Sequence, residues 1–305
     1  VLVVEGTFAE AVVLETLVLS ILNHDSAIAS AASRMTSAAA GRPCIEMGSR
    51  RTHEQAAVAA ARAAYLAGFE RTSNLEAGRR YGVPTTGTSA HAFTLLHDSE
   101  RDAFAAQLTA LGPGTTVLVD TYDVEAAVRT AVELAGPDLG AVRLDSGDLL
   151  VHAREVRALL DSLGATRTRI VVTSDLDENA IAALGAAPVD AYGVGTALVT
   201  GSGHPTSSMV YKLVAREGAS GALEPVAKKS RDKLSVGGRK WAVRRLGADG
   251  RAEAEIVGIG APPPNDGNDR PLMVEFVRGG VRINRSDLDD ASARHERSRD
   301  ELPRT

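Results

Sequence analysis

The chain has 305 residues and a single cysteine, Cys44, so it cannot form an internal disulfide. Proteins in oxidising compartments commonly depend on disulfides, and we therefore expect a reducing, cytoplasmic setting. An excess of positive charge is also missing, because 34 Lys and Arg stand against 39 Asp and Glu, for a net charge of -5. This balance disfavours a nucleic-acid binder, which normally carries a basic face.

A long hydrophobic run is not found near the start either. The longest apolar stretch there, residues 11–22, is shorter than a membrane span of roughly 20 residues and contains Glu15. No basic segment precedes it, so we expect neither a signal peptide nor a membrane partner. The chain opens with VLVVEG and no Met. We interpret VLVV as a strand and expect a further N-terminal portion ahead of it.

What is present over residues 1–207 is an alternation of short β-branched runs with helical stretches. The predicted strands are 1–4, 43–47, 69–73, 83–87, 115–120, 141–145, 169–174 and 190–194. The predicted helices are 8–40 with a break near 23–25, 52–67, 75–80, 91–96, 100–110, 124–135, 148–163 and 177–184. This order predicts a parallel sheet covered by helices.

Polar clusters at the strand ends bear on whether that sheet is open or closed. Seven such clusters are spread over the chain: EMGSRR, RTSN, GTSAH, VDTYD, RLDSGD, TSDLDE and YGVGT. An open doubly wound sheet would gather its site at one switch point. A barrel assembles its site from every loop that follows a strand. The distribution therefore favours an α/β fold with a TIM-like, irregular β/α barrel.

The pattern changes near residue 208, where segments typical of antiparallel strands begin. We predict a barrel domain over 1–207, a β-rich segment over 208–260, and a linker with a polar C-terminal helix over 261–305.

Arginine and carboxylate side chains at the strand ends indicate an anionic ligand. The guanidinium group of Arg50 can donate two parallel hydrogen bonds to a carboxylate or phosphate. The alternative is that Arg50 is an ordinary surface charge at the start of a helix. Arg143 ends an apolar strand, which helix capping does not explain. Asp145 and Asp148 are suited to Mg²⁺ or to ribose hydroxyls. Capping explains Ser146 and Asp148 equally well.

The remaining clusters are less specific. Ser174 and Asp175 fit a ligand contact or a helix cap equally well. Gly193 and Gly195 begin a glycine-rich stretch whose backbone N–H groups suit a phosphate. His91, in GTSAH, has the chemistry of a general base or nucleophile, but a lone histidine is more often structural. The residues alone predict a barrel enzyme for an anionic, phosphate-bearing substrate, with Mg²⁺.

Taken together and in order, these segments resemble nicotinate phosphoribosyltransferase. The resemblance spans nearly all of 1–245 and rests on FAEAVVLETLVLSILNHDSAIAS, EMGSRRTHE, TSNLEAG, YGVPTTGTSAHAF, LVDTYD, VRLDSGDL, VTSDLDE, YGVGT, YKLV and KKSRDKLSVGGRK. It implies a pentosyltransferase of NAD salvage, of the ATP-dependent, ligase type. Nicotinate and phosphoribosyl pyrophosphate would give nicotinate mononucleotide and pyrophosphate, coupled to ATP hydrolysis. The resemblance also implies a homodimer of the full-length protein.

The resemblance assigns roles to individual positions. His91 corresponds to the histidine that ATP phosphorylates, and Arg50 to an arginine near the pyridine ring. Arg143 and Asp145 correspond to the pair near the nicotinate carboxylate and the ribose. Further substrate contacts are implied at Ser146, Asp148, Ser174, Asp175, Gly193, Gly195 and Thr196, and Mg²⁺ at Asp145.

Two other positions concern the pyridine substrate. Asn74 stands where amide-using relatives carry Asp, which would repel a carboxylate. Asn74 therefore favours nicotinate over nicotinamide. Met47 stands where the family often has Phe, so ring stacking at that position would be replaced by a sulfur contact.

The resemblance further implies an N-terminal α/β portion that pairs with the strands of 208–260. Without it those strands would have an exposed edge, and we expect this chain alone to bind substrate poorly. Two alternatives remain at this point: a nicotinamide-using phosphoribosyltransferase, and an inactive barrel fragment with only a binding role.

Overall fold

The computed structural model describes residues 2–230 and 233–303. The chain divides into two compact units. One unit is formed by residues 24–207, and the other by residues 1–23 together with 208–305. The compact unit that holds the sheet therefore begins 23 residues later than the predicted barrel domain of 1–207.

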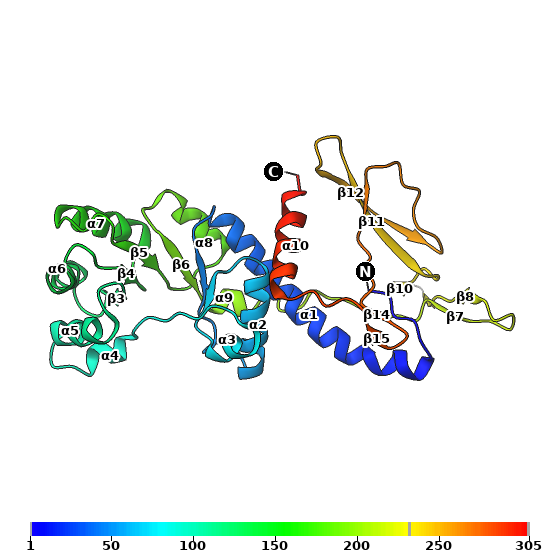
Figure 1. Cartoon of the computed structure of the whole chain (residues 1–305), viewed down its shortest axis with the longest axis horizontal. Coiled ribbons are helices and arrows are strands. Elements are labelled where there is room, and N and C mark those ends of the chain that lie inside the picture. Colours follow the sequence, from blue (N-terminus) through cyan, green and yellow to red (C-terminus); the bar gives the residue numbers. More distant parts are fainter. Residues whose placement is uncertain (1, 231–232, 304–305) are drawn as a thin grey trace. The chain divides into compact units, whose positions relative to one another are not determined.

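A six-stranded parallel sheet forms the centre of the unit 24–207 (Figure 1). Its order is β2-β1-β6-β5-β4-β3. The strands are β1 (Cys44–Glu46), β2 (Arg71–Thr72), β3 (Thr116–Leu118), β4 (Ala141–Leu144), β5 (Arg169–Val172) and β6 (Ala191–Val194). Each of them lies within a segment that the sequence predicts as a strand.

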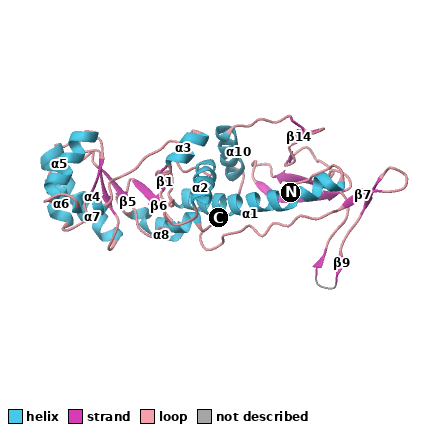
Figure 2. Ribbon diagram, turned by 90° about the horizontal axis from the view of Figure 1, so that it is seen from below, coloured by secondary structure: helices cyan, strands magenta, loops and turns pink. Residues whose placement is uncertain are grey.

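Helices and short turns connect the strands, as a parallel sheet requires. They are α1 (Phe8–Ala38), α2 (Glu54–Leu66), α3 (Leu75–Tyr81), α4 (His91–Leu95), α5 (Glu100–Leu111), α6 (Val124–Ala135), α7 (Leu149–Ser162), α8 (Glu178–Ala183), the 3₁₀ turn η1 (Leu184–Ala186) and α9 (Thr196–Val199). Figure 1 shows α5, α6 and α7 on the outer side of β3 and β4, and Figure 2 shows the same three helices from below.

The two faces of the sheet belong to different apolar clusters. Large apolar residues such as Val142, Leu144 and Ile170 belong to the main core with the helices. On the opposite, inner face Ala141, Val171 and Ala191 form a separate, smaller cluster. Because strand residues alternate between faces, polar residues at the strand ends can point inward while the core stays apolar.

The sheet is curled but does not close into the predicted TIM-like barrel within residues 2–230 and 233–303, because β2 and β3 remain its two edges. The predicted strand 83–87 supplies only one bridge, between Thr85 and Thr72. Pro84 has no N–H to donate, and glycine weakens a strand, so pairing stops there. The fold is a mixed α/β half-barrel.

Helix α1 is continuous, whereas a break was predicted near residues 23–25. No Gly or Pro interrupts it, and Asp25 is held by an ion pair with Arg62. By length and composition alone α1 is long and apolar enough to cross a membrane, and 11% of its most apolar 18-residue stretch is buried. Core helices of globular proteins can be equally long and apolar, and Ile28, Ala31 and Met35 of α1 lie in the core.

The other unit contains short strands that pair antiparallel, for example β11 with β12 and with β13. They are β7 (Ala215–Glu217), β8 (Leu223–Pro225), β9 (Lys229–Ser230), β10 (Lys233–Leu234), β11 (Lys240–Leu246), β12 (Ala252–Ile259), β13 (Asp269–Pro271), β14 (Val277–Arg278) and β15 (Val281–Arg282). The prediction of a strand at 1–4 is wrong for residues 2–4, which form none.

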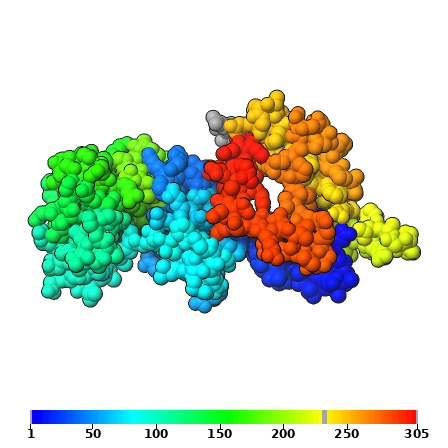
Figure 3. All heavy atoms as spheres, in the orientation of Figure 1, coloured from blue at the N-terminus to red at the C-terminus, as the bar shows by residue number. Residues whose placement is uncertain are grey.

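The C-terminal helix α10 (Leu288–Asp300) begins with a capping box made by Asp287 and Asp290. Figure 3 shows α10, in red, beside orange and yellow segments of the same unit. The buried Arg244 of β11 donates to Ser298 O in α10 and forms an ion pair with Glu301 at its end, which explains this attachment.

Candidate functional site

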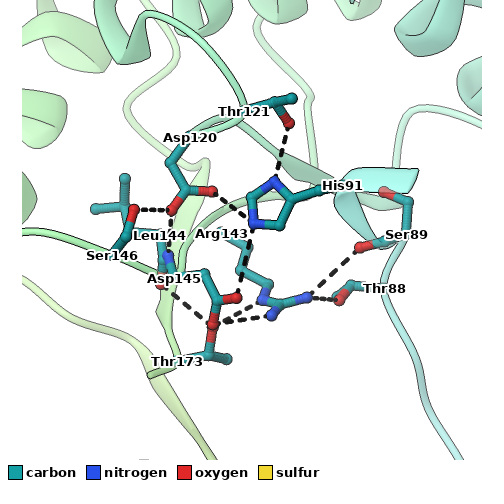
Figure 4. A network of polar contacts seen from close by, with 10 residues as sticks. All are labelled: Thr88, Ser89, His91, Asp120, Thr121, Arg143, Leu144, Asp145, Ser146 and Thr173. Carbon is teal, nitrogen blue, oxygen red and sulfur yellow. Dashed lines mark hydrogen bonds and ion pairs between the residues drawn. The ribbon is translucent and has the colours of Figure 1, made fainter. Parts of the chain in front are cut away.

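A polar cluster lies at the carboxyl ends of β3, β4 and β5 (Figure 4). Arg143 stands between Val142 and Leu144, which face the helices, so its side chain points to the inner face. Asp145 leaves β4 on the same face, and Asp120 follows β3. The carboxyl ends of neighbouring parallel strands meet at one edge, which brings these side chains together.

Arg143 is held from several sides. Its Nε donates to Thr173 Oγ1 at 2.8 Å, and its Nη1 donates to Thr88 Oγ1 at 2.6 Å. Its Nη2 forms an ion pair with Asp145 Oδ1 at 3.0 Å. The Arg143 side chain is only 11% exposed, and Thr173 also donates to Asp145. The guanidinium is therefore fixed before any ligand arrives.

His91 stands beside this pair as the first residue of α4. Its Nδ1 lies 3.2 Å from Thr121 Oγ1. Its Nε2 lies 3.9 Å from Asp120 Oδ1 and 3.8 Å from Asp145 Oδ2. The ring is 41% exposed, so His91 is not a core histidine. One ring nitrogen is anchored, and the other faces two carboxylates and open space.

Asp120 was not among the residues singled out from the sequence, although VDTYD was recognised as a polar cluster. Its Oδ2 accepts from Asp145 N at 2.9 Å and from Ser146 Oγ at 2.7 Å. Its Oδ1 is buried without a hydrogen-bond partner. The signal available was its place directly after the apolar run TVLV, the same signal that marked Asp145.

The loop that carries His91 is tied down by a buried glutamine, which the sequence did not mark. Ser89 Oγ donates to Gln107 Oε1 at 2.9 Å, and Gln107 Nε2 donates to Thr115 Oγ1 and Thr116 O. Gln107 therefore links the loop to β3. Since Thr85 bridges to β2 and Thr88 contacts Arg143, this loop crosses from one edge of the sheet toward the other.

Capping accounts for Asp148 but not for the residues after β5. Asp148 Oδ1 accepts from Leu150 N and Val151 N at the start of α7. The cap of α8 is Asp177, so Ser174 and Asp175 are not needed for that purpose. Ser174 has a φ of 123°, a strained value for a residue other than glycine. Such strain is typical of functional sites.

Arg50 and Asn74 lie at a different part of the sheet edge. They follow β1 and β2, and β1 is three strand spacings, about 14 Å, from β4. Within residues 2–230 and 233–303 no hydrogen bond or ion pair is found for the Arg50 side chain, which leaves it available for an anion. The structure therefore does not bring Arg50 into contact with Arg143.

The Asn74 side chain is already engaged. Its Oδ1 accepts from Ala77 N at 2.9 Å as the cap of α3, and its Nδ2 donates to Ser49 Oγ at 3.0 Å. An aspartate at this position could still accept from Ala77 N, but it could not donate to Ser49 Oγ. Asn74 thus has a structural role, which weakens its value as evidence for acid over amide.

Gly193 and Gly195 have different surroundings, although both were predicted to contact phosphate. Gly193 is buried within β6. A Cβ there would lie 2.5 Å from Thr173 Cγ2 and 2.8 Å from Met47 Sδ. Gly195 precedes Thr196 at the start of α9, and a Cβ there would meet only Met47 O, at 3.5 Å. Packing therefore explains Gly193, and contact with phosphate stays a prediction for all three residues.

Gly193→Ala is expected to lower the free energy of unfolding by about 1–3 kcal/mol, because the added methyl group overlaps Thr173 and Met47. Gly195→Ala is the matched control and should change it by less than about 1 kcal/mol. Urea denaturation measures both. Equal stability of the two variants would contradict the packing explanation.

The only cysteine, Cys44, lies in the core of this unit, away from the polar cluster. Burial, with a smaller contribution from Glu70, raises the pKa of its thiol to about 12. The thiolate that nucleophilic chemistry needs is therefore not formed near neutral pH.

Comparisons with known proteins agree on one family. The chain is 61% identical over 303 residues to nicotinate phosphoribosyltransferase pncB1 of Mycobacterium tuberculosis, covering 96% of this chain and 66% of the relative. No family model matches the chain. This chain thus spans just under two thirds of the length of that relative.

Two solved structures share the fold. Nicotinate-nucleotide pyrophosphorylase from Pyrococcus furiosus superposes with a TM-score of 0.80 at 26% identity, over 94% of this chain and 73% of that one. Human nicotinic acid phosphoribosyltransferase gives a TM-score of 0.76 at 26% identity, over 95% and 71%. On the sequence identity and the shared fold, the chain belongs to the nicotinate phosphoribosyltransferase family.

Proposed function

We propose that this protein makes nicotinate mononucleotide and pyrophosphate from nicotinate and phosphoribosyl pyrophosphate, coupled to ATP hydrolysis, in NAD salvage. The observation that carries the proposal is the fixed group of Arg143, Asp145 and His91 at the strand ends, in a chain of this family. We further propose a cytoplasmic homodimer.

Arg143 and Asp145 suit the two charges that develop in the reaction. Displacing pyrophosphate from C1 of the ribose gives an oxocarbenium-like sugar and an anionic leaving group. The guanidinium stabilises the anion, and a carboxylate beside it stabilises the cationic sugar. Because Thr173 and Thr88 hold the Arg143 side chain, little reorganisation accompanies the charge shift.

His91 suits the coupling to ATP. With the Nδ1 proton donated to Thr121 Oγ1, the Nε2 lone pair attacks the γ-phosphorus, the bond to the bridging oxygen breaks, and ADP leaves. Hydrolysis of the phosphohistidine by water then returns the imidazole and releases phosphate. Asp120 and Asp145, which flank Nε2, stabilise the positive charge that the ring carries during transfer.

The carboxylates also fit Mg²⁺. Asp120 Oδ1 is buried without a hydrogen-bond partner, Asp145 lies nearby, and carboxylate oxygens are the ligands this ion prefers. Asp145 and Asp120 would hold the ion, and it would offset the negative charge of bound phosphates.

The proposal is tested by incubating the protein with nicotinate and phosphoribosyl pyrophosphate, with and without ATP. Nicotinate mononucleotide and pyrophosphate should appear in equal amounts, and ATP should increase the yield. Pyrophosphate release without the nucleotide would contradict the proposal. Use of nicotinamide instead remains the second candidate, because Asn74 is engaged as the cap of α3 and with Ser49 and so does not by itself select the acid.

A further inference from the structure

Glu46, the last residue of β1, is a fully buried carboxyl group, at 0% exposure. No ion pair to Glu46 is found in the described part of the chain, residues 2–230 and 233–303. Burial raises the pKa of this carboxyl group, against the opposing effect of its hydrogen bonds to Thr72 and Gly48. A buried carboxyl group without a cation is costly, so its presence needs a reason.

The hydrogen bonds of Glu46 join the loop after β1 to the loop after β2. Its Oε1 accepts from Gly48 N, and its Oε2 accepts from Thr72 Oγ1. Thr72 Oγ1 accepts in turn from Asn74 N at 2.9 Å. Asn74 Nδ2 returns to the first loop by donating to Ser49 Oγ at 3.0 Å. The bonds therefore form a closed ring across the two loops.

A carboxylate completes this ring with two acceptor oxygens. The amide of glutamine could accept from Gly48 N, but its NH₂ group would have to donate to Thr72 Oγ1. The Thr72 hydroxyl would then turn away, and the charge that strengthens both bonds would be lost. The chain at Gly48 has no room to adjust, since a Cβ there would lie 2.2 Å from Val199 Cγ1. Two residues later comes Arg50, whose side chain has no partner among residues 2–230 and 233–303.

We propose that Glu46 is a positioning residue, which fixes the loop of Arg50 against the cap of α3 and so sets the affinity for the pyridine substrate. This rests on the proposed function and on the place near the pyridine ring that the family resemblance implies for Arg50. Glu46 itself touches no substrate, because it points to the helix side of the sheet while the inner face carries Arg143.

The test compares Glu46→Gln, Thr72→Val and Thr72→Ser in the protein. Glu46→Gln removes the charge that strengthens the bonds from Gly48 and Thr72, and Thr72→Val removes the hydroxyl group from the ring. For each variant we expect about a tenfold rise in KM for nicotinate, the equivalent of one hydrogen bond to a charged group. The KM for phosphoribosyl pyrophosphate should stay within about twofold. Thr72→Ser keeps the hydroxyl group and should restore the wild-type KM for nicotinate.

A measurement without substrate separates this proposal from the proposed function. Hydrogen exchange of the backbone amides of residues 48–51 should be faster in Glu46→Gln and Thr72→Val than in wild type or Thr72→Ser. Unchanged amide exchange in these variants overturns the role of Glu46, whatever the substrate is. An equal change in the KM values for nicotinate and for phosphoribosyl pyrophosphate also overturns it. Failure of the wild-type protein to make nicotinate mononucleotide, with faster exchange in the variants, overturns only the link to the pyridine.

Discussion

His91→Ala is expected to abolish the acid-labile label that γ-labelled ATP leaves on the protein, and to remove the dependence of turnover on ATP. The reason is that Nε2 of His91 is the proposed nucleophile and lies between Asp120 and Asp145, while Nδ1 is anchored on Thr121. Turnover without ATP should persist, because Arg143 and its partners do not depend on the ring for their positions.

His97→Ala provides the matched control for this experiment. His97 lies six residues further along the chain, with its Nδ1 2.8 Å from Phe93 O and its ring packed against Phe93. No carboxylate among residues 2–230 and 233–303 forms an ion pair with His97. We therefore expect that His97 is not phosphorylated and that the label remains in His97→Ala. A label that persists in His91→Ala would contradict the assignment.

Arg143→Ala is expected to lower kcat/KM for nucleotide formation by about 10²- to 10³-fold, the usual effect of removing a preorganised charge-stabilising donor. The loss has two parts, since the leaving anion loses its guanidinium and Asp145 loses its ion-pair partner. Arg143→Lys should recover only part of it. The lysine ammonium is a point charge. It lacks the planar guanidinium whose separate nitrogens contact Thr173, Thr88 and Asp145.

Arg169→Ala is the control for Arg143→Ala. Arg169 begins β5, at the opposite end of the sheet, where its exposed side chain makes one long contact, Nε to Gly140 O at 3.4 Å. Steady-state kinetics should show kcat/KM within about twofold of wild type for this variant. Equal kcat/KM for Arg143→Ala and wild type would remove Arg143 from the mechanism.

The strands of the sheet could be predicted because their own residue types favour β-structure. The runs TTVLVD, AVRLD and RIVVTS are β-branched and end in polar residues, and the structure confirms β3, β4 and β5 within them. Closure of the sheet could not be predicted in the same way. It depends on whether 83–87 pairs along its length, and Pro84 limits that pairing to Thr85.

The site was predictable where a residue conflicts with its local setting. Arg143 at the end of an apolar strand is such a case, and the structure places it on the inner face beside Asp145. Asp120 resembles an ordinary residue at the start of a turn, and only the folded chain brings it within 3.9 Å of His91. The packing role of Gly193 could not be predicted, because the side chains of Met47 and Thr173 that crowd it are distant from it in sequence.

The central claim, that the ligand is nicotinate, is tested most directly by competition. The protein is given equal concentrations of isotopically distinguishable nicotinate and nicotinamide with phosphoribosyl pyrophosphate and ATP, and the products are measured by mass spectrometry. The account predicts that nicotinate mononucleotide dominates and that its formation falls in Arg143→Ala. A predominance of nicotinamide mononucleotide would contradict it.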